Sequence, residues 1–187
     1  MANLLSNNVS VISDASHDVV GSFRVGFNPE GVGYCAETGE VYVANGSSNT
    51  VTVISNATNV VITTISVGRN PKTIAYDARS GHVLVTNFGS NNVSVISGST
   101  HAVLGTVQVG AGPFGVASDD ATGVVYVSNG YQGTISIIGD FQSPQGPASF
   151  GLSVWLLYGL LLSVVAVAGF LVILRYRTRK ERPPGLG

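Results

Sequence analysis

Three stretches of the chain decide its fold: VYVANGSSNTVTVIS at 41–55, VLVTNFGSNNVSVIS at 83–97 and VYVSNGYQGTISIIG at 125–139. Each stretch begins 42 residues after the one before it. Apolar or aromatic residues alternate with small polar residues on both sides of a turn rich in Gly, Asn and Ser, which is typical of a β-hairpin. A hairpin that returns at a constant step predicts a repeat protein.

The same 42-residue step holds outside these stretches. It relates three sets of identical residues: Pro29, Pro71 and Pro113; Gly39, Gly81 and Gly123; and Asn45, Asn87 and Asn129, with Asn3 one step earlier. Four short strands fit into each step and no helix does, which matches the ~40–45 residues of a β-propeller blade. The sequence therefore predicts an all-β, partial propeller of four-stranded antiparallel blades. We expect apolar residues such as Val41, Val43, Val51 and Val53 to face the neighbouring blades.

The three hairpins resemble the YVTN β-propeller repeat, which is named for a strand ending in Tyr-Val-Thr-Asn, and the resemblance covers residues 1–140. It implies a seven-bladed propeller of the kind frequent in archaeal surface-layer and cell-surface proteins and in bacterial secreted or periplasmic proteins. The fourth residue of the motif falls on Asn45, Asn87 and Asn129. We expect their side chains to cap the second strand of each blade by hydrogen bonds to the turn backbone. The repeated Pro, Gly and Asn residues are thus predicted to be structural.

About 3.3 units are present in residues 1–140: a partial blade at 1–24, blades at 25–66 and 67–108, and a partial blade at 109–140. The first unit starts at the end of its second strand and retains the outer two strands, whereas the last unit lacks its fourth strand. A closed propeller needs ~4–8 blades. We therefore expect an N-terminally truncated portion of a longer propeller or, alternatively, two chains that associate to complete one ring.

A membrane span is predicted at 151–174, where the 24 residues GLSVWLLYGLLLSVVAVAGFLVIL carry no charge. As a helix they would extend about 36 Å at ~1.5 Å per residue, enough for a hydrocarbon core of about 30 Å. A short stalk at 141–150 precedes the span, and the tail at 175–187 has five basic residues and one acidic residue. Basic flanks favour the cytoplasmic side. We expect a single-pass membrane protein with an extracellular propeller and a cytoplasmic tail.

The first residues, MANLLSNNVSV, lack the basic and apolar regions of a signal peptide. This favours a start further upstream or a fragment. Alternatively, the protein is tail-anchored with its N-terminus in the cytoplasm, although the basic tail disfavours that topology.

Charge and cysteine content exclude several classes of protein. Residues 1–150 carry nine acidic and four basic residues, so no basic face is available for nucleic acid. Cys35 is the only cysteine, so the chain has no internal disulfide, and we expect a free thiol near a turn. The Gly110, Gly112 and Gly115 pattern GxGxxG belongs to the repeat and is followed by no helix, which argues against a dinucleotide loop.

Candidate catalytic and metal-ligating residues are few. His17, His82 and His101 are expected to be solvated turn residues on separate blade edges rather than metal or haem ligands. Asp77, Asp119 and Asp120 are expected to form turns. The sequence thus predicts no catalytic, cofactor-binding or metal-binding residue. Four N-x-[ST] sequons are candidates for glycosylation, at Asn8, Asn45, Asn56 and Asn92.

The leading functional hypothesis is a non-catalytic, membrane-anchored surface protein whose propeller binds or adheres to an envelope protein or glycan. One alternative is a fragment of a propeller enzyme, of quinoprotein, lactonase-like or haem type, whose catalytic residues lie in missing blades. A second alternative is a structural spacer.

Overall fold

The computed structural model describes residues 1–139, which are all-β. No helix occurs in this range, and so none that could cross a membrane. The predicted stalk, membrane span and basic tail lie outside the described residues. The strands are β1 (Ala2–Asn3), β2 (Asn8–Ile12), β3 (Val19–Arg24), β4 (Pro29–Cys35), β5 (Glu40–Asn45), β6 (Thr50–Ser55), β7 (Val61–Ser66), β8 (Pro71–Asp77), β9 (His82–Asn87), β10 (Asn92–Ser97), β11 (Val103–Gln108), β12 (Pro113–Asp119), β13 (Val124–Asn129) and β14 (Thr134–Ile138).

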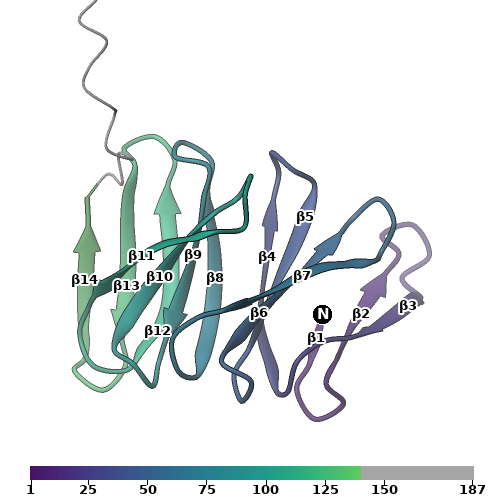
Figure 1. Cartoon of the computed structure of the whole chain (residues 1–187), viewed down its shortest axis with the longest axis horizontal. Helices are drawn as coiled ribbons and strands as arrows, with labels where there is room; N and C mark the ends of the chain where they lie inside the picture. The colour runs from purple at the N-terminus through teal and green to yellow at the C-terminus, as the bar shows by residue number, and fades with distance from the viewer. Residues whose placement is uncertain (140–187) are drawn as a thin grey trace, which may run out of the picture. The chain divides into compact units, whose positions relative to one another are not determined.

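These strands form four antiparallel sheets that follow one another in chain order (Figure 1). Sheet 1 is β1–β3, sheet 2 is β4–β7, sheet 3 is β8–β11 and sheet 4 is β12–β14. The predicted four-stranded unit is confirmed in sheets 2 and 3. Sheet 1 has the two expected outer strands plus β1, a two-residue remainder of the second strand, and sheet 4 has three strands within the described residues.

The first strands of successive units lie side by side: β4 lies beside β8, and β8 beside β12. Each of these inner strands begins with one of the repeated prolines. Proline has no N–H to donate to the ladder, so the first residue of a strand is a position where it is tolerated. The repeated glycines Gly39, Gly81 and Gly123 occupy the following turn with φ between 69° and 73°, a left-handed conformation that an L side chain rarely adopts.

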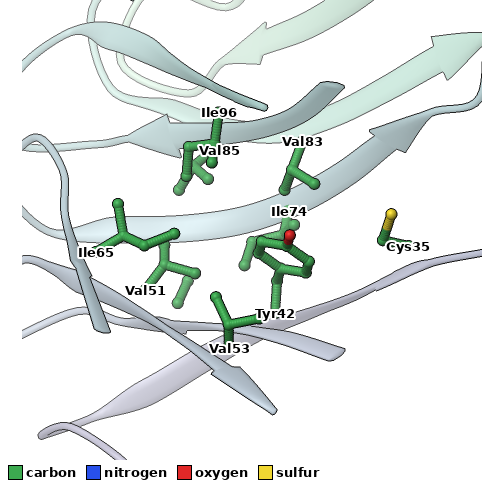
Figure 2. Close-up of a cluster of buried hydrophobic side chains, with 10 residues drawn as sticks. Cys35, Tyr42, Val51, Val53, Ile65, Ile74, Val83, Val85 and Ile96 are labelled. Carbon is green, nitrogen blue, oxygen red and sulfur yellow. The ribbon is translucent and has the colours of Figure 1, made fainter. Parts of the chain in front are cut away.

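The core lies between sheets. We call the side of each sheet that faces the next sheet its forward face, and the opposite side its rear face. The forward face of sheet 2, with Tyr42, Val51 and Val53, packs against the rear face of sheet 3 (Figure 2). That rear face contributes Ile74, Val83, Val85 and Ile96. Since a fully buried Val or Ile is worth roughly 1.5–3 kcal/mol, these interfaces provide most of the stabilisation of each unit.

The same arrangement recurs at the other two interfaces. Val9 of sheet 1 packs against Val43 and Ile54, with Val41 at the margin. Leu84 and its forward-face neighbours in sheet 3 pack against Val125 and Val127 of sheet 4. The prediction that alternate apolar residues of the central strands face the two neighbouring units is thus confirmed.

Between sheets 1 and 2 lies an apolar groove with a volume of about 240 Å³, lined by residues that include Val11, Phe23 and Val32. It lies beside the start of β1, where Met1 contributes to its lining. β1 and Met1 pair with β2 only as far as Ser10, so the edge of β2 beyond Ser10 has no partner strand within the described residues.

Candidate binding site

The repeated asparagines support the turn between the second and third strands. Asn45 is fully buried, and its Nδ2 donates to Thr50 Oγ1 at 3.2 Å and to Thr52 Oγ1 at 2.9 Å. Asn3, Asn87 and Asn129 make the equivalent pair of bonds, five and seven residues ahead. The sequence predicts hydrogen bonds from these asparagines to the turn backbone. In the structure the third strand pairs directly with the second, so its side chains accept the hydrogen bonds instead. The Oδ1 atoms of Asn45, Asn87 and Asn129 have no hydrogen-bond partner within residues 1–139.

Glycines of the repeated Val-Gly pair make room for these buried amides. A Cβ atom at Gly68 would lie 2.6 Å from Asn87 Cγ, and Gly26 and Gly110 stand in the same relation to Asn45 and Asn129. The pairing explains why the two residue types recur together.

A second set of asparagines links successive sheets, and sequence reasoning missed it. Asn7 Oδ1 accepts the backbone N–H of Asn28 at 2.9 Å, and the same bond joins Asn49 to Asn70 and Asn91 to Gly112. Asn7, Asn49 and Asn91 themselves have φ near 55°. Their recurrence in the 42-residue step was a signal that could have revealed the link.

The entry to each inner strand and the turn between the second and third strands lie at the same end of the sheets, along the lower edge of Figure 1. Several aromatic and charged residues that differ between units occur in these two segments. We call this set the aromatic rim: Phe27, Glu30, Lys72, Phe88, Phe114 and Tyr131. Since the scaffold contacts above use repeated residues, the rim residues are not needed to form the repeat.

The centre of the aromatic rim is a chain of contacts between three units. Lys72 Nζ lies 2.6 and 2.7 Å from the two carboxylate oxygens of Glu30. The same Nζ lies 5.5 Å from the centroid of the Phe88 ring, within cation–π range. Phe88 and Tyr131 have ring centroids 4.9 Å apart and planes tilted by 57°, a favourable aromatic geometry.

Three of the four rim aromatics, Tyr131 among them, are exposed to solvent. Phe27, Phe114 and Tyr131 are all exposed, although each carries a large apolar ring. Contiguous exposed apolar patches rimmed by polar groups mark interaction surfaces. The paired rings of Phe88 and Tyr131 beside the Glu30–Lys72 pair are the part of the rim that has this character. The rim can therefore offer flat apolar faces together with one carboxylate and one ammonium group.

The opposite end of the sheets carries most of the described ionisable groups. Glu40 Oε2 accepts from Thr38 Oγ1 at 2.8 Å and from Tyr42 Oη at 3.3 Å, and lies 2.9 Å from His101 Nε2. Burial raises the pKa of Glu40, but the hydrogen bonds from His101 and Thr38 outweigh burial, so the pKa is lowered overall. Burial and the nearby Glu40 raise the pKa of Tyr42, and burial and Glu37 raise that of Tyr76.

This arrangement predicts an acid-sensitive contact between sheets 2 and 3. Because the pKa of Glu40 is lowered on folding, its contribution is complete above the unfolded value of about 4.5 and is lost as pH falls through the folded value. We expect the full chain to lose stability below about pH 4.5, and Glu40→Gln to make its stability less dependent on pH in this range. The melting temperature, measured from pH 3 to 7, reports this dependence. His101→Ala should flatten the same curve, and an unchanged pH profile in both variants would contradict the assignment.

The histidines and the cysteine differ partly from expectation. His17 is exposed as predicted, but His82 is only 8% exposed and His101 pairs with Glu40. His101 lies in the turn between β10 and β11, as predicted, but sheet 2 brings Glu40 to its ring, which the local turn pattern does not reveal. His82 is the first residue of β9 rather than a turn residue. Cys35 is a free cysteine next to a turn, as expected: it is the last residue of β4, and its carbonyl accepts the Gly39 N–H. Its side chain is fully buried in the core between sheets 2 and 3. Its thiol is therefore inaccessible to a substrate.

Asp77 and Asp119 form turns as predicted. Asp77 accepts from the Arg79 N–H and the Ser80 hydroxyl, and Asp119 from the Ala121 N–H and the Thr122 hydroxyl. The Thr122 hydroxyl and the Ala121 N–H lower the pKa of Asp119. No cluster of three His, Cys, Asp or Glu side chains suited to a metal ion occurs in residues 1–139. The glycines at 110–115 lead into β12 rather than into a helix.

The sequons differ in accessibility. Asn45 is fully buried with its Nδ2 engaged, so the folded domain does not present it for modification. Asn8 and Asn92 are half-buried, and their Oδ1 atoms accept from Asn3 and Asn87. Asn56 is exposed, which leaves it as the most accessible candidate.

Comparison with solved structures shows the fold. The chain is similar to a Kuenenia stuttgartiensis hydrazine synthase, with a TM-score of 0.59 and 18% identity, over 74% of this chain and 45% of that one. It is also similar to the dihydro-heme d1 dehydrogenase NirN, with a TM-score of 0.59 and 14% identity, over 74% of this chain and 34% of that one. The chain thus spans less than half of either neighbour. No protein-family model and no curated protein sequence matches it. Together, fold and repeat define a β-propeller-like repeat protein, built as a partial propeller within the described residues.

Proposed function

We propose that this protein is a membrane-anchored cell-surface propeller of the YVTN repeat type whose aromatic rim binds a glycan of the cell envelope, without catalysis. The observation that carries the proposal is the exposed Tyr131 ring packed against Phe88, whose ring lies beside the Lys72 ammonium group of the Glu30–Lys72 pair. Flat aromatic faces suit the apolar C–H faces of sugar rings, and a carboxylate and an ammonium group can accept from and donate to hydroxyl groups. An envelope protein with similar chemistry is the other ligand that this surface would accept.

The described ionisable groups support a non-catalytic role. Catalytic acids and bases usually have a pKa shifted toward the working pH. The pKa of Glu40 is instead lowered and those of Tyr42 and Tyr76 are raised, so each moves away from neutrality. These groups hold neighbouring sheets together and are poor candidates for proton transfer at pH 7.

Placement at the cell surface rests on the sequence after residue 150. The uncharged segment at 151–174 is long enough to span a bilayer, and the basic residues at 175–182 favour a cytoplasmic tail. In this topology the propeller is extracellular, as in proteins of surface-layer type.

A second candidate is part of a propeller enzyme, for example of haem type, with its catalytic groups supplied beyond the residues described. The observation that favours it is the fold similarity to two proteins named as a synthase and a dehydrogenase.

Oligosaccharide binding to the full chain in detergent tests the proposal. An array of neutral and acidic oligosaccharides identifies a binding sugar, and calorimetric titration measures its affinity. We expect Tyr131→Ala to weaken binding by roughly 2–10-fold, the range for loss of one aromatic contact. Tyr34→Ala is the matched control, since Tyr34 is equally an exposed tyrosine but lies at the opposite end of the sheets.

An equal loss of sugar affinity in Tyr131→Ala and Tyr34→Ala would contradict a role for the aromatic rim. If no sugar binds and the Soret band of added haem is shifted and sharpened relative to that of free haem, the enzyme candidate is favoured. If neither a sugar nor haem binds, the hypothesis of a structural spacer remains.

A further inference from the structure

The charged residues of residues 1–139 are divided unevenly between the two ends of the sheets. The end that carries the aromatic rim, here called the rim end, has three Arg or Lys residues and one Asp or Glu residue: Arg24, Arg69, Lys72 and Glu30. The opposite end has seven Asp or Glu residues and one Arg residue: Asp14, Asp18, Glu37, Glu40, Asp77, Asp119, Asp120 and Arg79. The described part of the chain is therefore acidic as a whole, whereas its rim end is basic.

The two ends act on a charged ligand separately because they are far apart. Strands β8 and β9 have seven and six residues. A strand of six residues is about 20 Å long at ~3.3 Å per residue, and exposed charges are largely screened beyond ~8 Å at physiological ionic strength. An anion at the rim end therefore meets the basic residues there and is shielded from the acidic end.

The positive charge of Arg69 is not neutralised by Glu30. The two carboxylate oxygens of Glu30 lie 2.6 and 2.7 Å from Lys72 Nζ, so these two side chains compensate each other. The Arg69 side chain is exposed and makes no hydrogen bond or ion pair within residues 1–139. A guanidinium group presents a planar fork of N–H donors that fits a carboxylate, so Arg69 is the rim-end cation best suited to bind an anion.

Arg69 lies beside the paired rings of the aromatic rim. Its carbonyl accepts the Gly89 N–H at 2.9 Å and its N–H donates to Ser90 Oγ at 2.6 Å, which holds it next to Phe88. A Cβ atom at Gly89 would lie 3.1 Å from the Arg69 Cβ, so glycine at this position leaves room for the arginine side chain. Phe88 in turn packs against the exposed Tyr131 ring.

The scaffold does not require an arginine at this position. The residues one repeat before and after Arg69 are Phe27 and Ala111, and each accepts an N–H from the corresponding turn at 3.2 Å, as Arg69 does. The backbone arrangement is thus the same in all three units and only the side chain differs. The guanidinium group of Arg69 is therefore available for a ligand.

We propose that the glycan bound by the aromatic rim is acidic, with a sugar ring on Tyr131 and Phe88 and the sugar carboxylate on the Arg69 guanidinium group. This inference rests on the proposed glycan binding and names the class of sugar, an oligosaccharide that contains uronic acids. The rings supply the apolar contact with the sugar, and the guanidinium group donates two hydrogen bonds to one carboxylate, which selects acidic over neutral sugars.

Calorimetric titration of the full chain in detergent tests the proposal. The probes are tetrasaccharides of glucuronic, galacturonic and mannuronic acid, each compared with its carboxyl-reduced, uncharged form. We expect the acid form of a sugar that binds to bind at least ~10-fold more tightly than its reduced form, as for a charge-assisted hydrogen bond. Arg69→Gln should remove most of this difference and leave the affinity for the reduced form unchanged, and Arg69→Lys should restore part of the difference.

Arg24→Gln is the matched control. Arg24 is an exposed arginine at the rim end, but it ends the outer strand of sheet 1. Because exposed charges are screened over that separation, its replacement should change the affinity less than ~2-fold. Equal weakening by Arg69→Gln and Arg24→Gln, or equally tight binding of an oligonucleotide of the same net charge, would mean attraction by charge alone and would overturn the assignment to Arg69.

The comparison of acid and reduced sugars separates this inference from the proposed function. If both forms bind equally and Tyr131→Ala weakens both, the rim binds glycans but the preference for acidic sugars is wrong. If neither form of any of these sugars binds, and no neutral oligosaccharide binds either, this inference and the proposed glycan binding are both wrong.

Discussion

Gly31→Ala is expected to destabilise the protein by about 3 kcal/mol, at the upper end of the range for overpacking a core. A Cβ atom at Gly31 would overlap the backbone carbonyl oxygen of Lys72 and lie 3.0 Å from the Thr73 Cα. Both atoms belong to the backbone of β8, so no side-chain rotation can relieve the contact. The inner strands of sheets 2 and 3 would have to separate, which would also loosen the core between them. Denaturant unfolding of the full chain, followed by circular dichroism, measures the change.

Gly105→Ala is the matched control for this prediction. Gly105 lies in β11, its φ is not in the left-handed region, and a Cβ atom there would meet nothing within 4 Å. We expect a change within about 0.5 kcal/mol, or a slight gain because alanine reduces the entropy of the unfolded chain. Equal unfolding midpoints for the two variants would mean that β4 and β8 do not approach as closely as described.

The strands and turns were predictable because their causes are local. Alternating apolar residues set each strand, and the repeated residues Pro71 and Gly81 set where an inner strand begins and where it turns. The 42-residue phase then gave the number of strands in each sheet. Even the short β1 followed from the match of the first three residues to the end of a second strand.

The candidate site was not predictable in the same way, because its contacts join units that are distant in sequence. Lys72 meets Glu30 across 42 residues, and His101 meets Glu40 across 61. Each contact depends on the rotation between neighbouring sheets, which no local pattern encodes. The histidine pattern indicated a solvated turn, and only the packing of sheet 3 on sheet 2 brings the ring to a carboxylate. The aromatic rim was not predictable for a related reason: its members interrupt the repeat, and only residues that the units share stand out from the sequence.

The buried asparagines are the clearest case where a repeated residue was recognised but its partners were not. Asn87 donates from Nδ2 to Asn92 Oδ1 at 2.8 Å and to Ser94 Oγ at 2.9 Å, and Ser94 is fully buried. Since the third strand returns opposite the second, its side chains reach the amide before the turn backbone does. The contact is therefore set by strand pairing rather than by the turn.

Asn87→Ala is accordingly expected to cost about 2 kcal/mol. Loss of the amide leaves the Ser94 hydroxyl without this partner in a site that water does not reach, which costs ~1–3 kcal/mol, and the cavity adds to the loss. The buried Asn87 Oδ1 has no partner in the described residues, so its removal offsets part of the cost. Asn129→Ala is the matched comparison: the same two bonds go to Thr134 and Ser136, but Thr134 is exposed and Ser136 half-buried, so water can replace the amide. We expect this change to cost about 1 kcal/mol or less, measured by the same unfolding experiment. If the two asparagines proved equally costly, solvent access would not control the energetics, and the capping bonds alone would have to account for the repeat of Asn at this position.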